Sequence, residues 1–202
     1  MTNTVEGPDG LPRCSWCAAA PDFFEYHDKE WGFPVGDDQR LYEKICLESF
    51  QSGLSWRTIL SKRDNLRAAF EQFDFYKVAE FDESDVERLL QDAGIIRHRG
   101  KIEAVINNAK RAVEMVEQEG SLAAFMWRYE AKCGENFVPQ SQSTSPESKA
   151  LSKELKKRGW KFVGPTTAYA FMQAMGLIND HASECSMRPA VDAARAAFKV
   201  PS

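Results

Sequence analysis

The sequence lacks the features that mark membrane, secreted and fibrous proteins. None of its 202 residues lie in an apolar run approaching the roughly 18–20 residues that cross a bilayer. The opening residues, MTNTVEGPDG, have neither a basic start nor an apolar stretch, so we expect no signal peptide. Five cysteines are an odd number, which argues against a disulfide framework and favours the cytoplasm. Internal repeats and coiled-coil heptads are also missing.

Strand-like alternation of polar and apolar residues is scarce, whereas helical spacing is common. Ser84 is expected to cap one helix, Ser145 and Pro146 to open another, and Thr166 or Thr167 to open the next. We predict an all-α fold of about seven to nine helices. Three segments are expected: a disordered tail over residues 1–12, a helical domain over 13–188 and a C-terminal extension over 189–202. Two lobes around a pocket are one possible arrangement of the helical domain.

Charge of one sign is not in large excess, because 26 basic and 30 acidic residues give a net charge of −4. A pI near 5.5 argues at first against nucleic-acid binding. The bases are nevertheless concentrated in residues 57–67, 97–111 and 149–161. Each run alone is typical of a solvated helix face, but three runs in an acidic chain favour a separate basic surface.

Histidine is rare, and two of the three histidines have cysteines nearby. Cys185 follows His181 by one helical turn, and Cys14 precedes His27, so these four residues form a Cys2His2 set suited to tetrahedral Zn²⁺. Cys17 forms a CxxC pair with Cys14 and is a rival ligand. Buried thiols and ordinary histidines are the alternative interpretation of this spacing.

A tight turn, Phe162–Thr166, joins two predicted helices and is flanked by basic residues such as Lys161. The backbone N–H groups and the dipole at the start of the second helix suit a DNA phosphate. We therefore name Lys161, Val163, Gly164 and Thr166 as candidate DNA contacts. An ordinary helix–helix connection is the alternative.

Aromatic residues are dense in the first third of the chain, at Trp16, Phe23, Tyr26, Trp31 and Trp56. The carboxylate of Glu48 extends the apolar face of a helix in the same region, where a charge needs a partner or a function. Aromatic planes with one carboxylate suit an electron-poor heterocycle carrying N–H donors. A salt-bridged glutamate at the edge of the core is the competing interpretation.

The longest motifs resemble a known family. They are YHDKEWGFP, ICLESFQSGLSW, QDAGIIRHRGKI and LSKELKKRGWKFVGPTTAYAFMQAMGLINDH. Over about residues 13–185 they are similar to the DNA-3-methyladenine glycosylase I family of bacteria, within the helix-hairpin-helix superfamily. The resemblance implies a helix-hairpin-helix glycosylase fold in which one structural Zn²⁺ ties the N- and C-terminal regions together.

The resemblance also implies a role for each matching residue. Cys14, His27, His181 and Cys185 fall on the zinc ligands, and Glu48 falls on the acidic residue of the base pocket. Trp16, Phe23, Tyr26, Trp31 and Trp56 match the pocket aromatics, with Phe23 standing where relatives carry tyrosine. Gly53 and Leu54 match the loop that fills the gap in the duplex. Asp180, next to a ligand position, is a second candidate carboxylate.

The activity implied by the resemblance is base excision repair of alkylated double-stranded DNA. The enzyme would flip 3-methyladenine into the pocket and hydrolyse the N-glycosidic bond, releasing the free base and leaving an abasic site. No lysine nucleophile is implied, so we expect no lyase step. We expect a monomer in the bacterial cytoplasm without membrane contact. An inactive zinc-containing DNA-binding protein and a small-molecule-binding helical protein are the alternatives.

Overall fold

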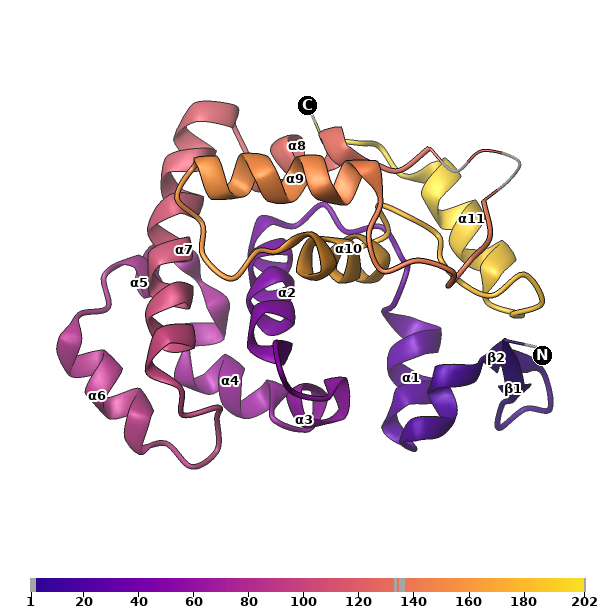
Figure 1. Cartoon of the computed structure of the whole chain (residues 1–202), viewed down its shortest axis with the longest axis horizontal. Helices are drawn as coiled ribbons and strands as arrows, with labels where there is room; N and C mark the ends of the chain where they lie inside the picture. The colour runs from indigo at the N-terminus through magenta and orange to yellow at the C-terminus, as the bar shows by residue number, and fades with distance from the viewer. Residues whose placement is uncertain (1–2, 133, 135–136, 202) are drawn as a thin grey trace.

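Eleven α-helices make up most of the part that is described in the computed structural model, which is residues 3–132, 134 and 137–201 (Figure 1). The helices are α1 (Asp22–Lys29), α2 (Asp38–Gln51), α3 (Trp56–Ser61), α4 (Arg63–Ala69), α5 (Phe75–Ala79), α6 (Glu83–Gln91), α7 (Arg99–Glu119), α8 (Leu122–Met126), α9 (Pro146–Lys157), α10 (Pro165–Ala174) and α11 (Arg188–Ala197). Three short 3₁₀ helices are η1 (Ser15–Ala19), η2 (Glu71–Phe73) and η3 (Trp127–Tyr129). Two strands, β1 (Thr4–Glu6) and β2 (Pro12–Cys14), complete the fold.

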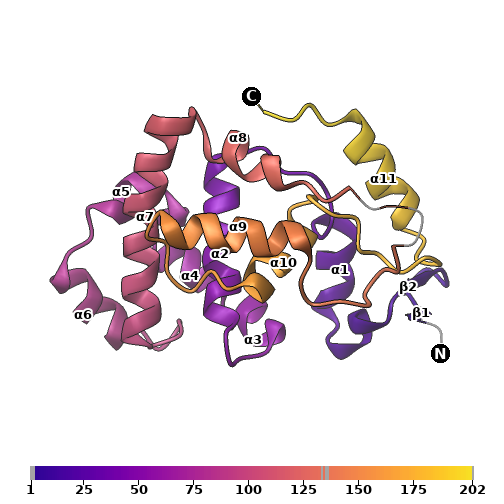
Figure 2. The same cartoon turned by 45° about the horizontal axis from the view of Figure 1, so that its top comes forward.

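Helix α2 runs through the middle of the molecule and is buried over most of its length (Figures 1 and 2). It begins at a cap in which Asp37 accepts a hydrogen bond from the backbone N–H of Arg40 at 2.8 Å. Helices α7, α8 and α10 pack around it. Because neighbours surround α2, its charged residues Lys44 and Glu48 lie inside the protein and must find partners there.

Helices α9 and α10 pack against each other and are joined by the predicted tight turn. Ser145 caps α9, and Pro146 occupies its first turn, as the sequence predicts. Helix α10 begins at Pro165, one or two residues before the predicted start at Thr166 or Thr167, since proline needs no partner for a backbone N–H there. The turn is tight enough to hold Phe162 at a φ of 56°.

The prediction of a disordered tail over residues 1–12 is wrong for its described part, residues 3–12. Strand β1 pairs antiparallel with β2, with Val5 opposite Arg13. The Arg13 side chain bonds to Asp9 at 2.8 Å and to Ser186 at 2.6 Å, and so attaches the hairpin to the C-terminal region. Three-residue strands are too short to show alternation in the sequence, and the contacts that hold them are distant along the chain.

The C-terminal extension predicted over residues 189–202 is mostly helix α11, which buries Val191. Ser84 does not cap α6. The N-cap of that helix is Asp82, two residues before Ser84, because Asp82 and Asp85 form a reciprocal capping box. The predicted helical class is confirmed, with more helices than expected and a small hairpin added. Most of the extra helices have only five to seven residues, too few for periodicity to separate them.

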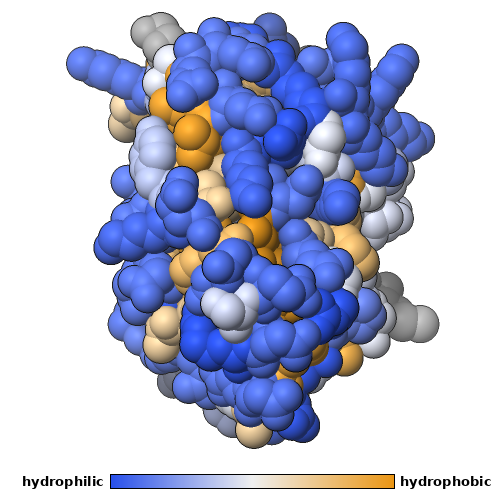
Figure 3. Space-filling view, turned by 90° about the vertical axis from the view of Figure 1, so that its left-hand side faces the viewer, coloured by the Kyte–Doolittle hydropathy of each residue, from blue (hydrophilic) through white to orange (hydrophobic). Residues whose placement is uncertain are grey.

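No helix in the described part of the chain is long and apolar enough to cross a membrane. Figure 3 shows the face that lies on the left in Figure 1, around α6 and α7. This face is largely hydrophilic, with hydrophobic groups confined to narrow bands between polar ones.

Candidate active site

A cavity of about 270 Å³ lies between the N-terminal segment, α2, α3 and α10. Its lining residues are Trp16, Phe23, Tyr26, Trp31, Glu48, Gln51, Trp56, Ala170 and Gln173. The structure therefore brings together all five predicted pocket aromatics and the predicted carboxylate. The space is suited to a flat ring system of one or two rings.

The aromatic walls hold one another in place. Trp16 meets Trp31 edge-on with ring centroids 5.2 Å apart, and it meets Phe23 edge-on at 5.7 Å. The ring centroids of Tyr26 and Trp56 lie 5.3 Å apart. Such contacts fix the ring planes before a ligand arrives, which reduces the entropy lost on binding.

Glu48 is a buried carboxylate, and its partner is Lys44, one helical turn earlier on α2. The Lys44 ammonium lies 2.8 Å from Glu48 Oε1 and donates to the Tyr26 hydroxyl at 2.7 Å. It also lies 3.6 Å from the ring centroid of Trp56. The two interpretations of Glu48 are thus compatible, since it is salt-bridged and also lines the cavity.

Lys44, Gln51 and Gln173 also lie at this site and were not predicted from the sequence. The signal for the first two was helical spacing from Glu48, at minus four and plus three. Gln173 donates to Asp180 at 2.6 Å. Asp180 is fully buried and is absent from the residues that line the cavity, so it is placed to orient Gln173 rather than to reach a ligand.

A second cavity of about 260 Å³ adjoins the first and shares Glu48, Gln51 and Ala170 with it. Its other lining residues are Ser52, Thr166 and Thr167. The space thus reaches from the carboxylate to the start of α10. A ligand that filled both cavities would have its ring among the aromatics and its remainder beside the turn.

The predicted duplex-filling loop is exposed and firmly anchored. Leu54 is 40% exposed, although it is a large apolar residue. Directly before it, the buried Lys101 ammonium donates to the carbonyls of Phe50 at 2.8 Å and Ser52 at 2.5 Å. Lys101 belongs to a predicted basic run, but it caps the end of α2 instead of facing solvent.

The turn before α10 offers fewer contacts than predicted. The Val163 side chain is fully buried. The backbone N–H of Lys161 already donates to Asn108 Oδ1 at 2.8 Å. Gly164 and Thr166 lie at the start of α10, where backbone N–H groups lack helical partners. Of the four predicted contacts, Lys161 therefore offers its exposed side chain, and Gly164 and Thr166 are placed at the helix start.

The expected basic surface is smaller than the three runs suggest. Several arginines of these runs form ion pairs within the described structure: Arg63, Arg67, Arg99, Arg111 and Arg158. Arg67, for example, lies 2.7 Å from Glu43. On α9, Lys149, Lys153 and Lys156 form no ion pair within the described residues. Exposed bases without an ion pair in the described structure therefore remain in all three runs, at Arg57, Arg97 and Lys110 and on α9, and Lys161 adds one beside the α9–α10 turn.

A cluster of sulfur and imidazole groups lies on the other side of the aromatic layer that Trp16 and Trp31 form. Ligand atoms of Cys14, His27 and Cys185 lie within 4.8 Å of one another, and all three residues are buried. The His27 Nδ1 atom pairs with Asp28 at 2.6 Å, which leaves Nε2 facing Cys185 Sγ at 3.5 Å. A hydrogen bond from Cys14 lowers the pKa of Cys185, which favours the thiolate that a metal binds.

His181, the fourth predicted ligand, is not among these clustered ligand atoms, although its ring centroid lies 4.7 Å from that of His27. Its Nδ1 atom pairs with Asn179 Oδ1 at 3.0 Å, and its buried Nε2 atom has no hydrogen-bond partner in the described structure. Burial lowers the pKa of His181 to about 3, so the ring stays neutral and able to bind a metal. Gly32 leaves room for this ring, because a Cβ there would lie 2.7 Å from His181 Cε1. Two thiols and two neutral imidazoles fit tetrahedral Zn²⁺.

The remaining cysteines lie apart from this donor set. Cys17 is buried but is not among the clustered ligand atoms, so the structure does not favour it as the rival ligand. Cys46 lies in the core on α2. Cys133 lies outside the described residues.

The fold and the cavity define a class: a helical protein with a preformed aromatic pocket for a flat, polar heterocycle, open towards a helix start that suits phosphate. The methyladenine glycosylase family model matches residues 16–189. The chain belongs to the methyladenine glycosylase family.

Two curated relatives are similar over nearly their whole length. DNA-3-methyladenine glycosylase 1 of Escherichia coli is 50% identical, over 89% of this chain and 98% of the relative. DNA-3-methyladenine glycosylase of Haemophilus influenzae is 48% identical, over 86% and 96%. The family match over residues 16–189 includes the pocket, the loop at Gly53 and the α9–α10 turn.

Solved structures agree with this assignment. A crystal structure of 3-methyladenine DNA glycosylase I is 50% identical with a TM-score of 0.80, covering 86% of this chain and 98% of its own. A second such protein, crystallised in complex with 3-methyladenine, is 34% identical with a TM-score of 0.82, covering 88% and 97%. The fold is therefore shared with proteins of which one binds 3-methyladenine.

Proposed function

We propose that this protein is a DNA-3-methyladenine glycosylase of base excision repair. It hydrolyses the N-glycosidic bond of 3-methyladenine in alkylated double-stranded DNA, and the products are the free base and an abasic site. The observation that carries the proposal is the open aromatic cavity of about 270 Å³ with the carboxylate of Glu48 in its wall. Family membership and relatives named for this activity support it.

The reaction begins with a base whose leaving ability is already raised. Methylation at N3 places positive charge on adenine, which weakens the glycosidic bond and reduces the need for acid catalysis. The faces of Trp16, Trp31 and Trp56 attract a cationic ring. Glu48 accepts a hydrogen bond from the base edge and stabilises the positive charge that develops on the sugar. Water then attacks the sugar, and no lysine adduct is formed.

DNA binding uses the surface around the second cavity. Leu54 is exposed and enters the base stack in place of the flipped nucleotide. Backbone N–H groups at the start of α10 bind a phosphate in the manner of a helix-hairpin-helix motif, with Lys161 nearby. The second cavity, between this turn and Glu48, has the position and size for the flipped sugar.

We further propose that Cys14, His27, His181 and Cys185 hold one structural Zn²⁺. The clustered thiols and the unpartnered Nε2 atom of His181 support this set. Such an ion would stabilise the fold by joining β2 and α1 to the segment before α11. It has no part in the chemistry of the pocket. We expect a monomer that acts in the bacterial cytoplasm, where its DNA substrate lies.

One assay tests the proposed activity. Purified protein is incubated with methylated double-stranded DNA, and the released bases are separated and measured. We expect free 3-methyladenine and intact strands containing abasic sites. Absence of 3-methyladenine release would reject the glycosylase proposal, and strand cleavage at the abasic sites without added base would reject a monofunctional enzyme.

A further inference from the structure

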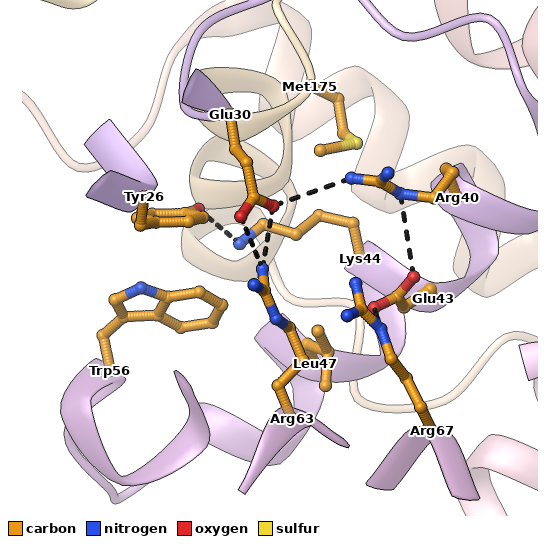
Figure 4. Close-up of a pocket in the computed structure, with 10 residues that line it drawn as sticks. All are labelled: Tyr26, Glu30, Arg40, Glu43, Lys44, Leu47, Trp56, Arg63, Arg67 and Met175. Atoms are coloured by element: carbon orange, nitrogen blue, oxygen red, sulfur yellow. Dashed lines mark hydrogen bonds and ion pairs between the residues drawn. The ribbon is translucent and has the colours of Figure 1, made fainter. Parts of the chain in front are cut away.

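The ammonium of Lys44 stands directly behind the wall of the base pocket. Its side chain is only 6% exposed, and it is not among the residues that line the larger cavity. Figure 4 shows it pointing between Tyr26 and Trp56 in a network of charged residues. The cavity on this side has a volume of only about 10 Å³, so the network leaves no room for a ligand.

Three contacts account for the three protons of this ammonium. One reaches Glu48 Oε1 at 2.8 Å, one reaches the Tyr26 hydroxyl oxygen at 2.7 Å, and the third faces the Trp56 ring at 3.6 Å from its centroid. All three partners line the base pocket. Lys44 therefore touches the pocket through its walls and can act only by positioning them.

These contacts decide which hydrogen bonds the pocket can offer. Because the Tyr26 oxygen accepts from Lys44, its own proton is left to donate elsewhere, and no described residue accepts it. Burial holds the pKa of Tyr26 well above its usual value, so the proton is retained. Lys44 occupies Oε1 of Glu48, which leaves Oε2 as an acceptor. The Gln51 amide can both donate and accept a hydrogen bond, so it does not select between a donor and an acceptor on the base edge.

We propose that Lys44 is a positioning residue that sets the polarity of the base pocket, keeping Tyr26 as a donor and Glu48 as an acceptor. This inference rests on the proposed glycosylase function. Adenine offers an amino donor beside the N7 acceptor, whereas guanine offers two acceptors, O6 and N7, on the same edge. Tyr26 can donate to N7 of either base, whereas Glu48 can accept from the amino group of 3-methyladenine but would face the O6 acceptor of 3-methylguanine. The pair thus favours 3-methyladenine over 3-methylguanine.

The other nearby carboxylates are paired with arginines, so Lys44 is the charged group that contacts both Tyr26 and Glu48. Glu30 is taken by Arg63 at 2.8 Å, and Glu43 is taken by Arg67 at 2.7 Å (Figure 4). The oxygens of Tyr26 and Glu48 both lie within 2.8 Å of the Lys44 nitrogen. Without that nitrogen, the Tyr26 proton would turn to Glu48, and the donor would be lost to the base.

The test compares single-turnover excision of 3-methyladenine and 3-methylguanine from the same methylated duplex. In Lys44→Met, which keeps the length of the side chain, we expect 3-methyladenine excision to slow roughly tenfold. Excision of 3-methylguanine should slow less, because its O6 acceptor gains no hydrogen bond from Glu48 that could be lost, so the ratio of the two rates falls. Lys101→Met is the matched control, because it removes a buried lysine that contacts only backbone carbonyls. Its two rates should fall together.

An unchanged ratio in Lys44→Met would overturn the inference, since a merely structural lysine would slow both reactions alike. If Lys44→Met does not fold, Tyr26→Phe tests the same point by removing the donor while retaining the Lys44–Glu48 pair. It should slow both excisions to a similar extent, because N7 of either base can accept from Tyr26, and unchanged excision of both bases would overturn the inference that Tyr26 is held as a donor. Wild-type protein that releases no 3-methyladenine would instead reject the proposed function, so the two failures are distinguishable.

Discussion

Two polar clusters lie on either side of one aromatic layer, and consecutive residues of α1 serve them. Tyr26 faces the cluster with Lys44 and Glu48, and His27 faces the cluster with Cys14 and Cys185. Trp16 contacts both residues, with ring centroids 6.3 Å from Tyr26 and 5.3 Å from His27. Both clusters are buried and both contain ionisable groups.

The clusters differ in what lies beside them. The carboxylate of Glu48 borders a cavity of about 270 Å³, whereas the sulfur and imidazole groups are enclosed by protein. A closed donor set is typical of a structural metal site, and a catalytic group needs space for its substrate. Access to a cavity, and not the presence of ionisable groups, therefore distinguishes the Glu48 cluster from the cluster of Cys14, His27 and Cys185.

The largest expected effect is on the closed cluster. Cys185→Ser removes one of the proposed zinc ligands and should cost roughly 3–5 kcal/mol, or about 10 °C in melting temperature for a chain of this size. Calorimetry with metal analysis measures both losses. Cys17→Ser is the matched control, since it changes a buried thiol outside the donor set. Equal losses in the two variants would contradict the assignment.

On the open cluster, Glu48→Gln should affect catalysis far more than folding. The amide oxygen can still accept from Lys44, but the negative charge is lost, so we expect single-turnover excision to fall about 100-fold or more. Circular dichroism should show a folded protein. A rate within a factor of three of wild type would show that Glu48 is not the catalytic carboxylate.

Acid should weaken the closed cluster in a predictable direction. Burial lowers the pKa of His181 from 6.5 to about 3, so the folded state excludes a proton that the unfolded state binds. Stability is therefore full above pH 6.5 and falls by roughly 1.4 kcal/mol per pH unit as the pH drops towards 3. Denaturant titrations of chelator-treated protein at pH 7, 6 and 5 measure this slope. Glu48→Gln should retain it, and a flat profile would contradict a buried neutral His181.

The smallest effect is expected at the rim of the pocket. Leu54→Ala removes an exposed side chain, so the melting temperature should hardly change. Excision from duplex DNA should slow about tenfold, because the gap left by the flipped base is no longer filled. Leu11→Ala, which truncates an exposed leucine on the N-terminal hairpin, is the control. A rate unchanged in Leu54→Ala would remove Leu54 from base flipping.

Local signals made part of the structure predictable. The start of α9 was predictable because Ser145 and Pro146 cap it within one turn. The pocket aromatics were predictable because most of them cluster in a short segment, and motifs quoted from the sequence cover the rest. The proposed donor set follows from residue type, and the structure clusters three of its members, Cys14, His27 and Cys185, without Cys17.

Contacts between distant segments could not be predicted. Strand β1 is held by β2 and by the side chain of Arg13, which reaches Ser186. The basic runs look solvated in sequence, but Arg63 and Arg67 find carboxylates on α2 and the preceding loop. The contacts of Lys44 could not be predicted from α2 alone, because Tyr26 and Trp56 approach it from other elements.

One measurement tests the separation of the two regions directly: single-turnover excision of 3-methyladenine by Cys185→Ser and Glu48→Gln, expressed per folded molecule, at a temperature where both are folded. If the two clusters act separately, we expect a rate near that of wild type for Cys185→Ser and a loss of about 100-fold for Glu48→Gln. A comparable loss in both variants would contradict it, because the closed cluster would then take part in the chemistry.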